Sequence, residues 1–367
     1  MAFKRVGIIG SGQLGRMMAL AGTPLDLEFV FFDEAEASPS SNLGQNIKPS
    51  ENDALERFLD SVDVITYESE NTDPDLVRQI NLTKPVFPGE ASLKKSQHRL
   101  IEKNTFRDLG IDTANFLRVT SKNELIQATK SLGLPIVLKT TTMGYDGKGQ
   151  AVVKTEADID QAWNELAGNE LIAESFVNFG RELSIIAVRG INGETKIYPI
   201  AENDHSNGIL RVSRVPAKNI NPKKQKQAEE FITTMLTHLE HVGVLTLELF
   251  DCEDGLVVNE MAPRVHNSGH WSMEGSHCGQ FENHIRAICG MPLGDTEARH
   301  EAIAMINIIG LIGDRNSVLK LPNAHLHLYG KAERLNRKLG HINILASSES
   351  EINNSLKELE AFINECG

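Results

Sequence analysis

The segment LELFDCEDGLVVNE, Leu247–Glu260, is the most informative part of this 367-residue sequence. Two apolar runs flank an acidic turn that contains Asp254 and Gly255, a dipeptide typical of β-hairpins. Glu248 and Glu260 are equally far from Asp254 in the sequence, so a regular hairpin would place them opposite each other. Opposed carboxylates repel, because their Cβ atoms are about 5 Å apart. The pair therefore suits a divalent cation such as Mg²⁺, unless a bulge shifts the register or both side chains face water.

The loop that follows, NEMAPRVHNSGHWS (Asn259–Ser272), combines an acid, an arginine and two histidines. A loop has no core to fill, so this mixture indicates ligand contact or chemistry. A solvated turn is the simpler interpretation. A zinc site formed by His266 and His270 is disfavoured, because Gly269 disfavours the helix that this spacing suits and the glutamate of an HExxH motif is absent.

A glycine-rich segment lies upstream, where Gly144, Gly147 and Gly149 separate two predicted strands in VLKTTTMGYDGKGQAVV. A Walker loop runs from a strand into a helix and carries GK[ST], so this segment is not one. The backbone N–H groups of such a hairpin can close over a triphosphate, although an ordinary exposed loop also fits the glycines. Lys139, at the end of the preceding strand, is placed to reach a phosphate.

The first residues fit the dinucleotide pattern GxGxxG, with Gly10, Gly12 and Gly15 after a strand and Asp33 after the next strand. One interpretation is an NAD-dependent dehydrogenase. The weaker interpretation, which we prefer, is that the helix N-terminus binds some phosphate group or only packs tightly. Alternating strand and helix signals in this region predict a parallel α/β sheet.

Composition limits the classes of protein that the chain can belong to. Hydrophobic residues make up 40% and charged residues 24% of the sequence, as in soluble globular proteins, and the length predicts two or three domains. The net charge of -13 argues against a general binder of nucleic acid or anionic membranes. The four cysteines form no CxxC pair, which indicates reduced thiols and a cytoplasmic location. We expect neither a nucleic-acid nor a membrane partner.

Taken together and in this order, the motifs resemble the ATP-grasp superfamily over nearly the whole chain. The resemblance also rests on the segments GSGQLGRM, TYESEN, ESFV, RELS, ENDHSNGIL and HLYGKAERLNRKLGHINI. The fold it implies is α/β (α+β). An N-terminal parallel α/β pre-ATP-grasp domain is expected over residues 1–95, and an ATP-grasp domain over 96–298, with subdomains 96–172 and 173–298. A small, mostly-β C-terminal domain is expected over 299–367.

The resemblance implies an ATP site. Arg99 and Lys139 would contact phosphates, residues 174–177 would form the adenine hinge, and Glu182 would bind the ribose. Glu248 and Glu260 would hold Mg²⁺, with two ions expected, which agrees with the independent hairpin argument. The residues expected at ATP are Arg99, Lys139, Gly144, Tyr145, Asp146, Gly147, Lys148, Gly149, Gln150, Glu174, Ser175, Phe176, Val177, Glu182, His205, Asn259 and Glu260.

Within the superfamily, the chain resembles ligases of purine biosynthesis that carboxylate 5-aminoimidazole ribonucleotide with ATP and bicarbonate, releasing ADP and phosphate. In that chemistry bicarbonate is first activated as carboxyphosphate, and the exocyclic amine then receives the carboxyl group. Asp146 is the candidate acceptor of the amine proton. The residues implied in catalysis are Tyr145, Asp146, Lys148, Arg264 and His266, and those implied in substrate binding are Gly12, Gln13, Leu14, Glu70, Asn267, Ser268, Lys331, Arg337 and Lys338.

The alternative enzyme is the formate-dependent glycinamide ribonucleotide transformylase of the same superfamily, although its corresponding loop differs from HNSGHW. A non-catalytic nucleotide sensor would not need the full set of metal and phosphate residues. A solvated turn is an alternative for the basic cluster of Lys331, Arg337 and Lys338. The resemblance also implies a homodimer.

Overall fold

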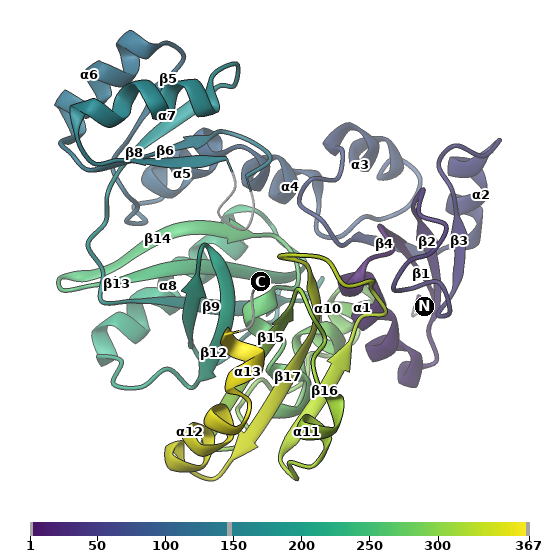
Figure 1. Ribbon diagram of the computed structural model, residues 1–367. Coiled ribbons are helices and arrows are strands. Elements are labelled where there is room, and N and C mark those ends of the chain that lie inside the picture. Colours follow the sequence, from purple (N-terminus) through teal and green to yellow (C-terminus); the bar gives the residue numbers. More distant parts are fainter. Residues whose placement is uncertain (1–2, 145–148, 365–367) are drawn as a thin grey trace.

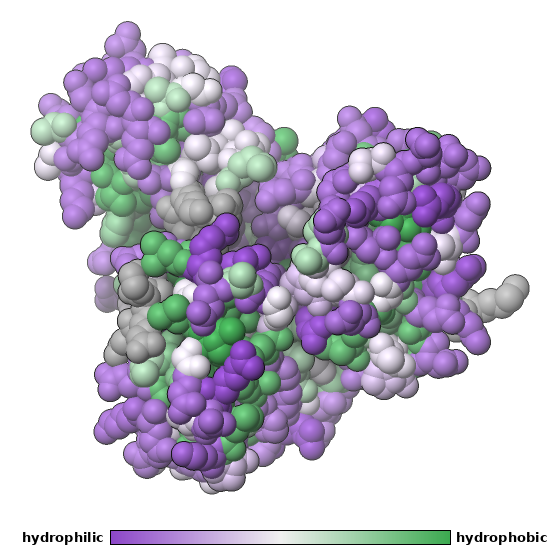
Figure 2. Space-filling model, turned by 45° about the vertical axis from the view of Figure 1, so that its right-hand side comes forward, coloured by the Kyte–Doolittle hydropathy of each residue, from purple (hydrophilic) through white to green (hydrophobic). Residues whose placement is uncertain are grey.

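Three β-sheets with covering helices build the molecule, which is seen in a computed structural model that describes residues 3–144 and 149–364 (Figure 1). The N-terminal sheet, a small second sheet and a large central sheet occupy separate lobes. Figure 2 shows the surface hollowed between these lobes. Within the described residues, no helix is both long and apolar enough to cross a bilayer.

The N-terminal sheet is parallel, with strand order β3-β2-β1-β4, as the alternation of strand and helix signals predicted. All four residues of β4 are buried, which is typical of a parallel strand covered on both faces. The elements of this lobe are β1 (Arg5–Ile9), α1 (Gln13–Gly22), β2 (Glu28–Phe32), β3 (Gln45–Ile47), α2 (Ala54–Ser61), β4 (Val64–Tyr67) and α3 (Pro74–Ile80).

The second sheet is antiparallel, with strand order β5-β8-β6-β7. Helices α4 (Glu90–Gln97) and α5 (Arg99–Asp108) connect it to the first lobe, and α6 and α7 pack on it around a core that includes Leu125 and Leu138. Its elements are β5 (Phe116–Val119), α6 (Lys122–Leu132), β6 (Ile136–Thr140), β7 (Gln150–Val153), α7 (Ile159–Leu166) and β8 (Leu171–Ser175).

The central sheet has nine strands within the described residues. Eight follow the order β14-β13-β9-β11-β12-β15-β17-β16, and β10 pairs with β9. The strands are β9 (Arg181–Arg189), β10 (Thr195–Ile197), β11 (Ala201–Ser206), β12 (Ile209–Val215), β13 (Gly243–Cys252), β14 (Gly255–Ala262), β15 (Ala302–Ile309), β16 (Ala324–Leu328) and β17 (Lys338–Ala346). The C-terminal strands continue this sheet, because β15 pairs with β12. They therefore do not form a sheet of their own.

Helices cover the central sheet. The apolar periodicity of residues 228–239 predicts a helix that packs on a core, and α8 (Pro222–His238) buries that face against β9 and β13. The remaining helices are α9 (Ser272–Gly275), α10 (Gln280–Ile288), α11 (Arg315–Leu319), α12 (Glu349–Glu358) and α13 (Glu360–Asn364).

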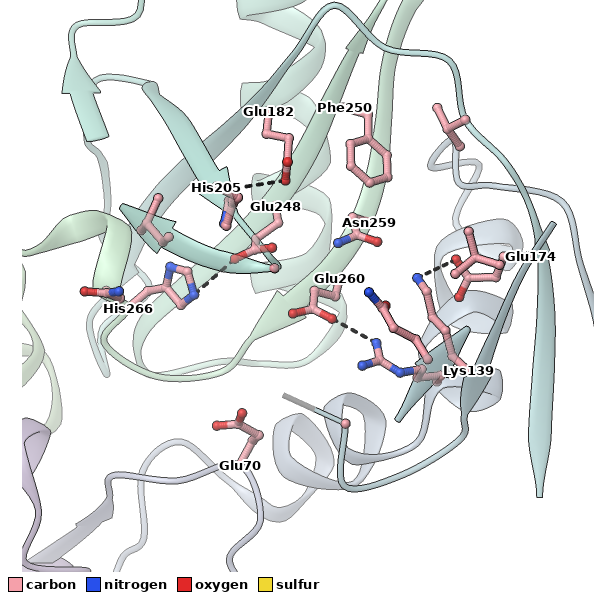
Figure 3. A pocket seen from close by; sticks show the side chains of 18 of the residues that line it. Glu70, Lys139, Glu174, Glu182, His205, Glu248, Phe250, Asn259, Glu260 and His266 are labelled. Atoms are coloured by element: carbon pink, nitrogen blue, oxygen red, sulfur yellow. Dashed lines mark hydrogen bonds and ion pairs between the residues drawn. The ribbon is translucent and has the colours of Figure 1, made fainter. Parts of the chain in front are cut away.

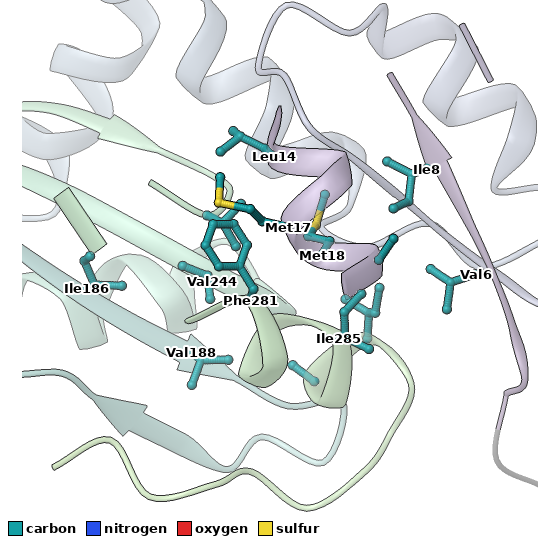
Figure 4. Packing of buried hydrophobic residues seen from close by; sticks show 14 of the residues in the cluster. Val6, Ile8, Leu14, Met17, Met18, Ile186, Val188, Val244, Phe281 and Ile285 are labelled. Atoms are coloured by element: carbon teal, nitrogen blue, oxygen red, sulfur yellow. The ribbon is translucent and has the colours of Figure 1, made fainter. Parts of the chain in front are cut away.

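Strand β9 has two different faces, because successive side chains alternate across a strand. Leu183 and Ile185 belong to the core beneath α8. On the other face, Ile186 and Val188 pack in the core that also holds Phe281 of α10 and the methionines of α1 (Figure 4). Glu182 and Ser184 share this second face by their position in the strand. The face thus changes from apolar to polar along its length, and the polar end leads toward the cavity described next.

Candidate active site

A cavity of about 560 Å³ brings together residues from all three lobes. Figure 3 shows side chains from several elements pointing into it. The residues predicted from the sequence that line it are Gln13, Leu14, Glu70, Arg99, Lys139, Gly144, Gln150, Glu174, Ser175, Phe176, Val177, Glu182, His205, Glu248, Asn259, Glu260, Arg264, His266, Asn267 and Lys338.

The hairpin of β13 and β14 places its two glutamates opposite each other, but for a reason that the sequence argument missed. The turn residues are Glu253 and Asp254, because Cys252 pairs with Gly255. With that centre, a regular ladder would set Asn259 opposite Glu248. A bulge shifts the register, and Glu248 pairs with Glu260. Because a bulge sets two residues against one, both Asn259 and Glu260 reach the cavity.

The two glutamates form an oxygen-rich site. Burial and the neighbouring charge of Glu260 raise the pKa of Glu248 to about 7. Oε2 of Glu260 accepts a hydrogen bond from Arg99 at 2.8 Å, and Oε1 of Glu248 lies 3.3 Å from Nε2 of His266. Among the described residues, buried Oδ1 of Asn259 has no hydrogen-bond partner. These oxygens suit a hard cation such as Mg²⁺.

A buried ion pair lies at the other side of the same cavity. Nζ of Lys139 donates to Oε2 of Glu174 at 2.9 Å, and Nζ of Lys103 lies 3.5 Å from that oxygen. Burial tends to raise the pKa of Glu174, but the two lysines outweigh it and hold the pKa at about 2. Glu174 is therefore ionised. Sequence reasoning missed Lys103, because a lysine on a helix is usually exposed.

The predicted hinge, residues 174–177, begins with the last two residues of β8 and continues beyond the strand. The N–H groups of Ser175 and Phe176 already donate to the carbonyls of Asn115 and Pro135, at 2.8 and 3.2 Å. Apolar side chains flank this edge, and the rings of Phe179 and Phe250 stack with centroids 4.4 Å apart. Sequence reasoning missed several apolar residues of the wall, namely Val137, Val152, Phe179, Leu210 and Phe250.

His205, Glu182 and Glu248 lie at the side of the cavity where the nucleotide is predicted to bind. Nδ1 of His205 lies 3.2 Å from Oε2 of Glu182. Burial lowers the pKa of His205, but Glu182 and the charge of Glu248 outweigh that effect, so the pKa is raised. Beside Glu182, the imidazole of His205 therefore binds a second ring proton more readily than an ordinary histidine does.

Arg264 and His266 occupy the loop after β14. Arg264 forms an ion pair with Glu70, whose pKa burial would raise but Arg264 holds at about 2. Burial, together with the charges of Arg264 and Lys338, lowers the pKa of His266 to about 3. The loop therefore presents a fixed guanidinium and a neutral imidazole.

The glycine pattern near the N-terminus surrounds a protein carboxylate. The N–H groups of Gly12 and Gly15 donate to the two oxygens of Glu68, each at 2.7 Å. A Cβ atom at Gly12 would lie 2.4 Å from Oε1 of Glu68, so any larger residue there would displace this carboxylate. The anion position at the start of α1 is already filled, and the dehydrogenase interpretation is wrong. Tight packing, which was the other part of the weaker interpretation, is what the structure has.

Several predicted residues lie outside the cavity wall. Ser268 is fully buried behind His266, and the N–H of Gly12 is used by Glu68. Nζ of Lys331 donates to Oε1 of Gln13, which lines the cavity, and burial lowers the pKa of Lys331 to about 8. Arg337 donates to the carbonyl of Ala332 at 3.2 Å. Gly149 borders the hairpin with φ of +70°. Tyr145, Asp146, Gly147 and Lys148 lie outside the described residues.

Comparison with known proteins defines the class first. The family profile described as "ATP-grasp domain" matches residues 104–281, and "Ribonucleotide synthetase preATP-grasp domain" matches residues 3–97. The profile "Phosphoribosylaminoimidazole carboxylase C-terminal domain" matches residues 303–355. The chain is thus an ATP-grasp protein and an ADP-forming ligase by class, as the motifs predicted.

Individual relatives then define the family. N5-carboxyaminoimidazole ribonucleotide synthase of Pseudomonas aeruginosa is 44% identical over 98% of this chain and 99% of its own length. The Bacillus subtilis protein of the same name is 41% identical over 94% and 92% of the two chains. This chain belongs to the N5-carboxyaminoimidazole ribonucleotide synthase family.

Solved structures agree with this assignment. The synthetase of Thermus thermophilus superposes with a TM-score of 0.93, at 42% identity over 98% of this chain and 99% of the other. The Aspergillus clavatus synthase, solved with ADP and 5-aminoimidazole ribonucleotide, superposes with a TM-score of 0.91, at 29% identity over 98% of each chain.

Proposed function

We propose that this enzyme uses ATP and bicarbonate to carboxylate 5-aminoimidazole ribonucleotide at its exocyclic amine, in purine biosynthesis, and releases ADP and phosphate. The observation that carries the proposal is the single cavity whose wall holds Lys139, Glu248 and Glu260 together with Arg264 and His266. One cavity can therefore hold a nucleotide and an acceptor at once. Membership of the synthase family selects the substrates.

On the nucleotide side, ATP would bind with its phosphates near positively charged side chains and its base against an apolar surface. Lys139 and Arg99 would meet the phosphates, because their positive charge lies on the cavity wall. The stacked rings of Phe179 and Phe250 supply an apolar wall beside residues 174–177, which suits a purine base. Glu182 would accept hydrogen bonds from the ribose.

The groups that would hold Mg²⁺ are Glu248, Glu260 and Oδ1 of Asn259, which has no hydrogen-bond partner in the part of the chain that the structure describes. Magnesium usually takes one or two carboxylates together with phosphate oxygens, which these residues and ATP can supply. When bound, the ion would offset the negative charge that two carboxylates and a triphosphate bring together. Two ions are expected, as predicted from the sequence.

The reaction would begin with attack of a bicarbonate oxygen on the γ-phosphorus, which breaks the bond to ADP and forms carboxyphosphate. Catalysis of this step is mostly positioning and charge stabilisation, for which Arg264 and neutral His266 are suited as donors. Carboxyphosphate then releases phosphate and CO₂, and the amine nitrogen attacks the carbon and loses a proton. Exclusion of water protects the intermediate.

Acceptor binding would use Gln13, Leu14, Glu70, Asn267 and Lys338, which line the cavity. Lys331, which donates to Gln13, and Arg337 would add positive charge for the 5′-phosphate. The predicted roles of Tyr145, Asp146 and Lys148, including proton acceptance by Asp146, stay predictions. The homodimeric state and the cytoplasmic location stay predictions as well.

The test measures ADP release with 5-aminoimidazole ribonucleotide plus bicarbonate, against glycinamide ribonucleotide plus formate. We expect turnover only with the first pair, and at least a 100-fold loss in Glu260→Gln, because the charge at the phosphates is altered. Circular dichroism would check that the variant is folded. Turnover only with the second pair would instead identify the formate-dependent transformylase and contradict the proposal.

A further inference from the structure

Four buried side chains outside the cavity form a continuous hydrogen-bond chain that ends on His266. Oγ of Ser213 donates to Oδ1 of Asn203 at 2.7 Å, and Nδ2 of Asn203 donates to Oγ of Ser184 at 3.1 Å. Oγ of Ser184 and Oγ of Ser268 are 2.7 Å apart. Oγ of Ser268 lies 2.8 Å from Nδ1 of His266.

The direction of this buried hydrogen-bond chain follows from its donors. Because Ser184 accepts from the amide of Asn203, its own hydroxyl hydrogen is free to point at Ser268. Ser268 in turn can donate to Nδ1 of His266. The backbone N–H of Ser268 also points at that nitrogen, at 3.4 Å. Two donors directed at Nδ1 make it an acceptor, so the ring proton belongs on Nε2.

Nε2 is the nitrogen that faces the cavity. It lies 3.3 Å from Oε1 of Glu248, and both residues line the cavity wall. Ser184 is the cross-strand neighbour of Glu248 in the pairing of β9 with β13. The hydrogen-bond chain therefore lies beside Glu248, on the same face of the sheet.

The four supporting residues do not line the cavity. Ser184, Ser213 and Ser268 are fully buried, and Asn203 is 6% exposed. Burying polar groups is costly unless each one is hydrogen-bonded, and linked hydrogen bonds polarise and strengthen one another. A satisfied chain of this kind is rigid and can hold a terminal side chain in one orientation and one protonation pattern.

We propose that Ser268, Ser184, Asn203 and Ser213 are positioning residues that hold His266 as the tautomer with its proton on Nε2. In that form His266 donates into the cavity, toward Glu248 and toward oxyanions that bind beside it. The other tautomer would turn a lone pair toward the carboxylate and remove the donor. The expected effect on kcat rests on the proposed function, whereas the assignment of the His266 tautomer does not.

The experiment uses the full chain labelled with ¹⁵N-histidine, with the His266 signals assigned by their loss in His266→Gln. Long-range ¹H–¹⁵N spectra at pH 7.5 should show Nε2 of His266 protonated and Nδ1 bare. Ser184→Ala removes a link that does not touch His266. We expect it to produce a mixture of tautomers and to lower kcat about tenfold, with KM for ATP changed less than about twofold.

Ser92→Ala is the matched control. Oγ of Ser92 lies 2.9 Å from Nδ1 of His241, and both residues are fully buried. Like Ser184→Ala, the variant removes one buried, hydrogen-bonded serine hydroxyl, but at a histidine away from the cavity. We expect a comparable loss of stability, with the His266 spectrum and kcat unchanged.

The outcomes separate the two proposals. A bare Nε2 in the unaltered protein, or a doubly protonated ring, would overturn the tautomer assignment. A lower kcat in Ser184→Ala without any change in the His266 spectrum would show that the hydrogen-bond chain has only a structural role. If the unaltered enzyme does not carboxylate 5-aminoimidazole ribonucleotide, the proposed function fails, but the spectra of the two variants still decide the inference.

Discussion

Lys139, Lys103 and Glu174 share one buried charge arrangement in which two lysines surround one carboxylate. Oε2 of Glu174 lies 2.9 Å from Nζ of Lys139 and 3.5 Å from Nζ of Lys103. All three side chains are at least nine-tenths buried. One positive charge remains in excess, and an anionic ligand can offset it. The sequence predicted Lys139 from its position at the end of a strand, but it could not show that Glu174 holds that lysine.

Replacing Lys139 by Met should lower the affinity for ATP by at least tenfold, because a phosphate partner is lost. It should also lower the free energy of unfolding by about 1–3 kcal/mol, since Glu174 loses one buried partner and keeps Lys103. ATP titration and urea denaturation measure the two effects.

The control for this variant is Lys122→Met. Nζ of Lys122 lies 2.9 Å from Oδ1 of Asp160, in a pair whose side chains are 44% and 72% exposed. Exposed pairs contribute about 0–1 kcal/mol, so we expect little change in stability and none in ATP affinity. An unchanged ATP affinity in Lys139→Met would exclude Lys139 as a phosphate ligand.

Helix α10 shows what sequence periodicity missed at the scale of elements. Its buried face carries Asn283 and His284 beside the apolar residues Phe281, Ile285 and Ile288, and apolar periodicity does not show which polar side chains are buried. Tertiary contacts satisfy both residues. Nε2 of His284 is 2.9 Å from Oγ1 of Thr66 in β4, and Nδ1 accepts from the N–H of Val244 in β13. The helix thus joins the N-terminal sheet to the central one.

Stability should fall in acid because of His284. Burial, with a smaller effect of His241, lowers its pKa in the folded chain to about 3 from an ordinary value of 6.5. The unfolded chain therefore binds the proton first, and stability that is fully present above pH 6.5 is lost progressively as the pH falls toward 3. In His284→Gln, the difference in unfolding free energy between pH 7.5 and 5.5 should shrink by about 1 kcal/mol.

Urea denaturation at the two pH values measures this difference. His300→Gln, at an exposed position, is the control and should retain the pH dependence of the unaltered chain. An equal pH dependence in His284→Gln and the unaltered chain would contradict the assignment.

The hairpin of β13 and β14 shows what a local sequence pattern can predict and what it cannot. The turn signal and the alternating apolar residues correctly predicted two paired strands. Near the turn, the predicted pairing of the two strands differs from the observed pairing by one residue. The bulge at Asn259 shifts the register, so that Glu248 and Glu260 are paired as predicted. A bulge depends on what the strand packs against, so the spacing of two glutamates alone could not predict it.

The whole molecule depends on a sheet that both the ATP-grasp region and the C-terminal region build. β12 pairs with β15, and Val212 belongs to the same core as Ile306, Ile342 and Ile352 of the C-terminal region. The sequence predicted a small C-terminal domain, and the limits of the three domains stay predictions. The shared sheet implies that residues 299–367 are needed by the strands before them.

Truncation after residue 300 should therefore prevent native folding. It would leave the edge of β12 and the apolar side chains of its core exposed, which favours aggregation. Calorimetry should show no native-like transition, and size-exclusion chromatography should show aggregates. A chain shortened only to residue 364 is the control, with one transition close to that of the full chain. A soluble 1–300 fragment with a cooperative transition would refute the dependence.

The sequence by itself determined the family, the types of most elements and the residue types of the cavity. These depend on local patterns, namely apolar periodicity, glycine spacing and motifs whose order is specific. Only the tertiary structure decided the register of the hairpin, the filling of the N-terminal glycine turn by Glu68 and the withdrawal of Ser268 behind His266. Each of these is a contact between residues that local patterns do not relate. Their energies depend on burial and on partners from other elements, so the folded chain alone decides them.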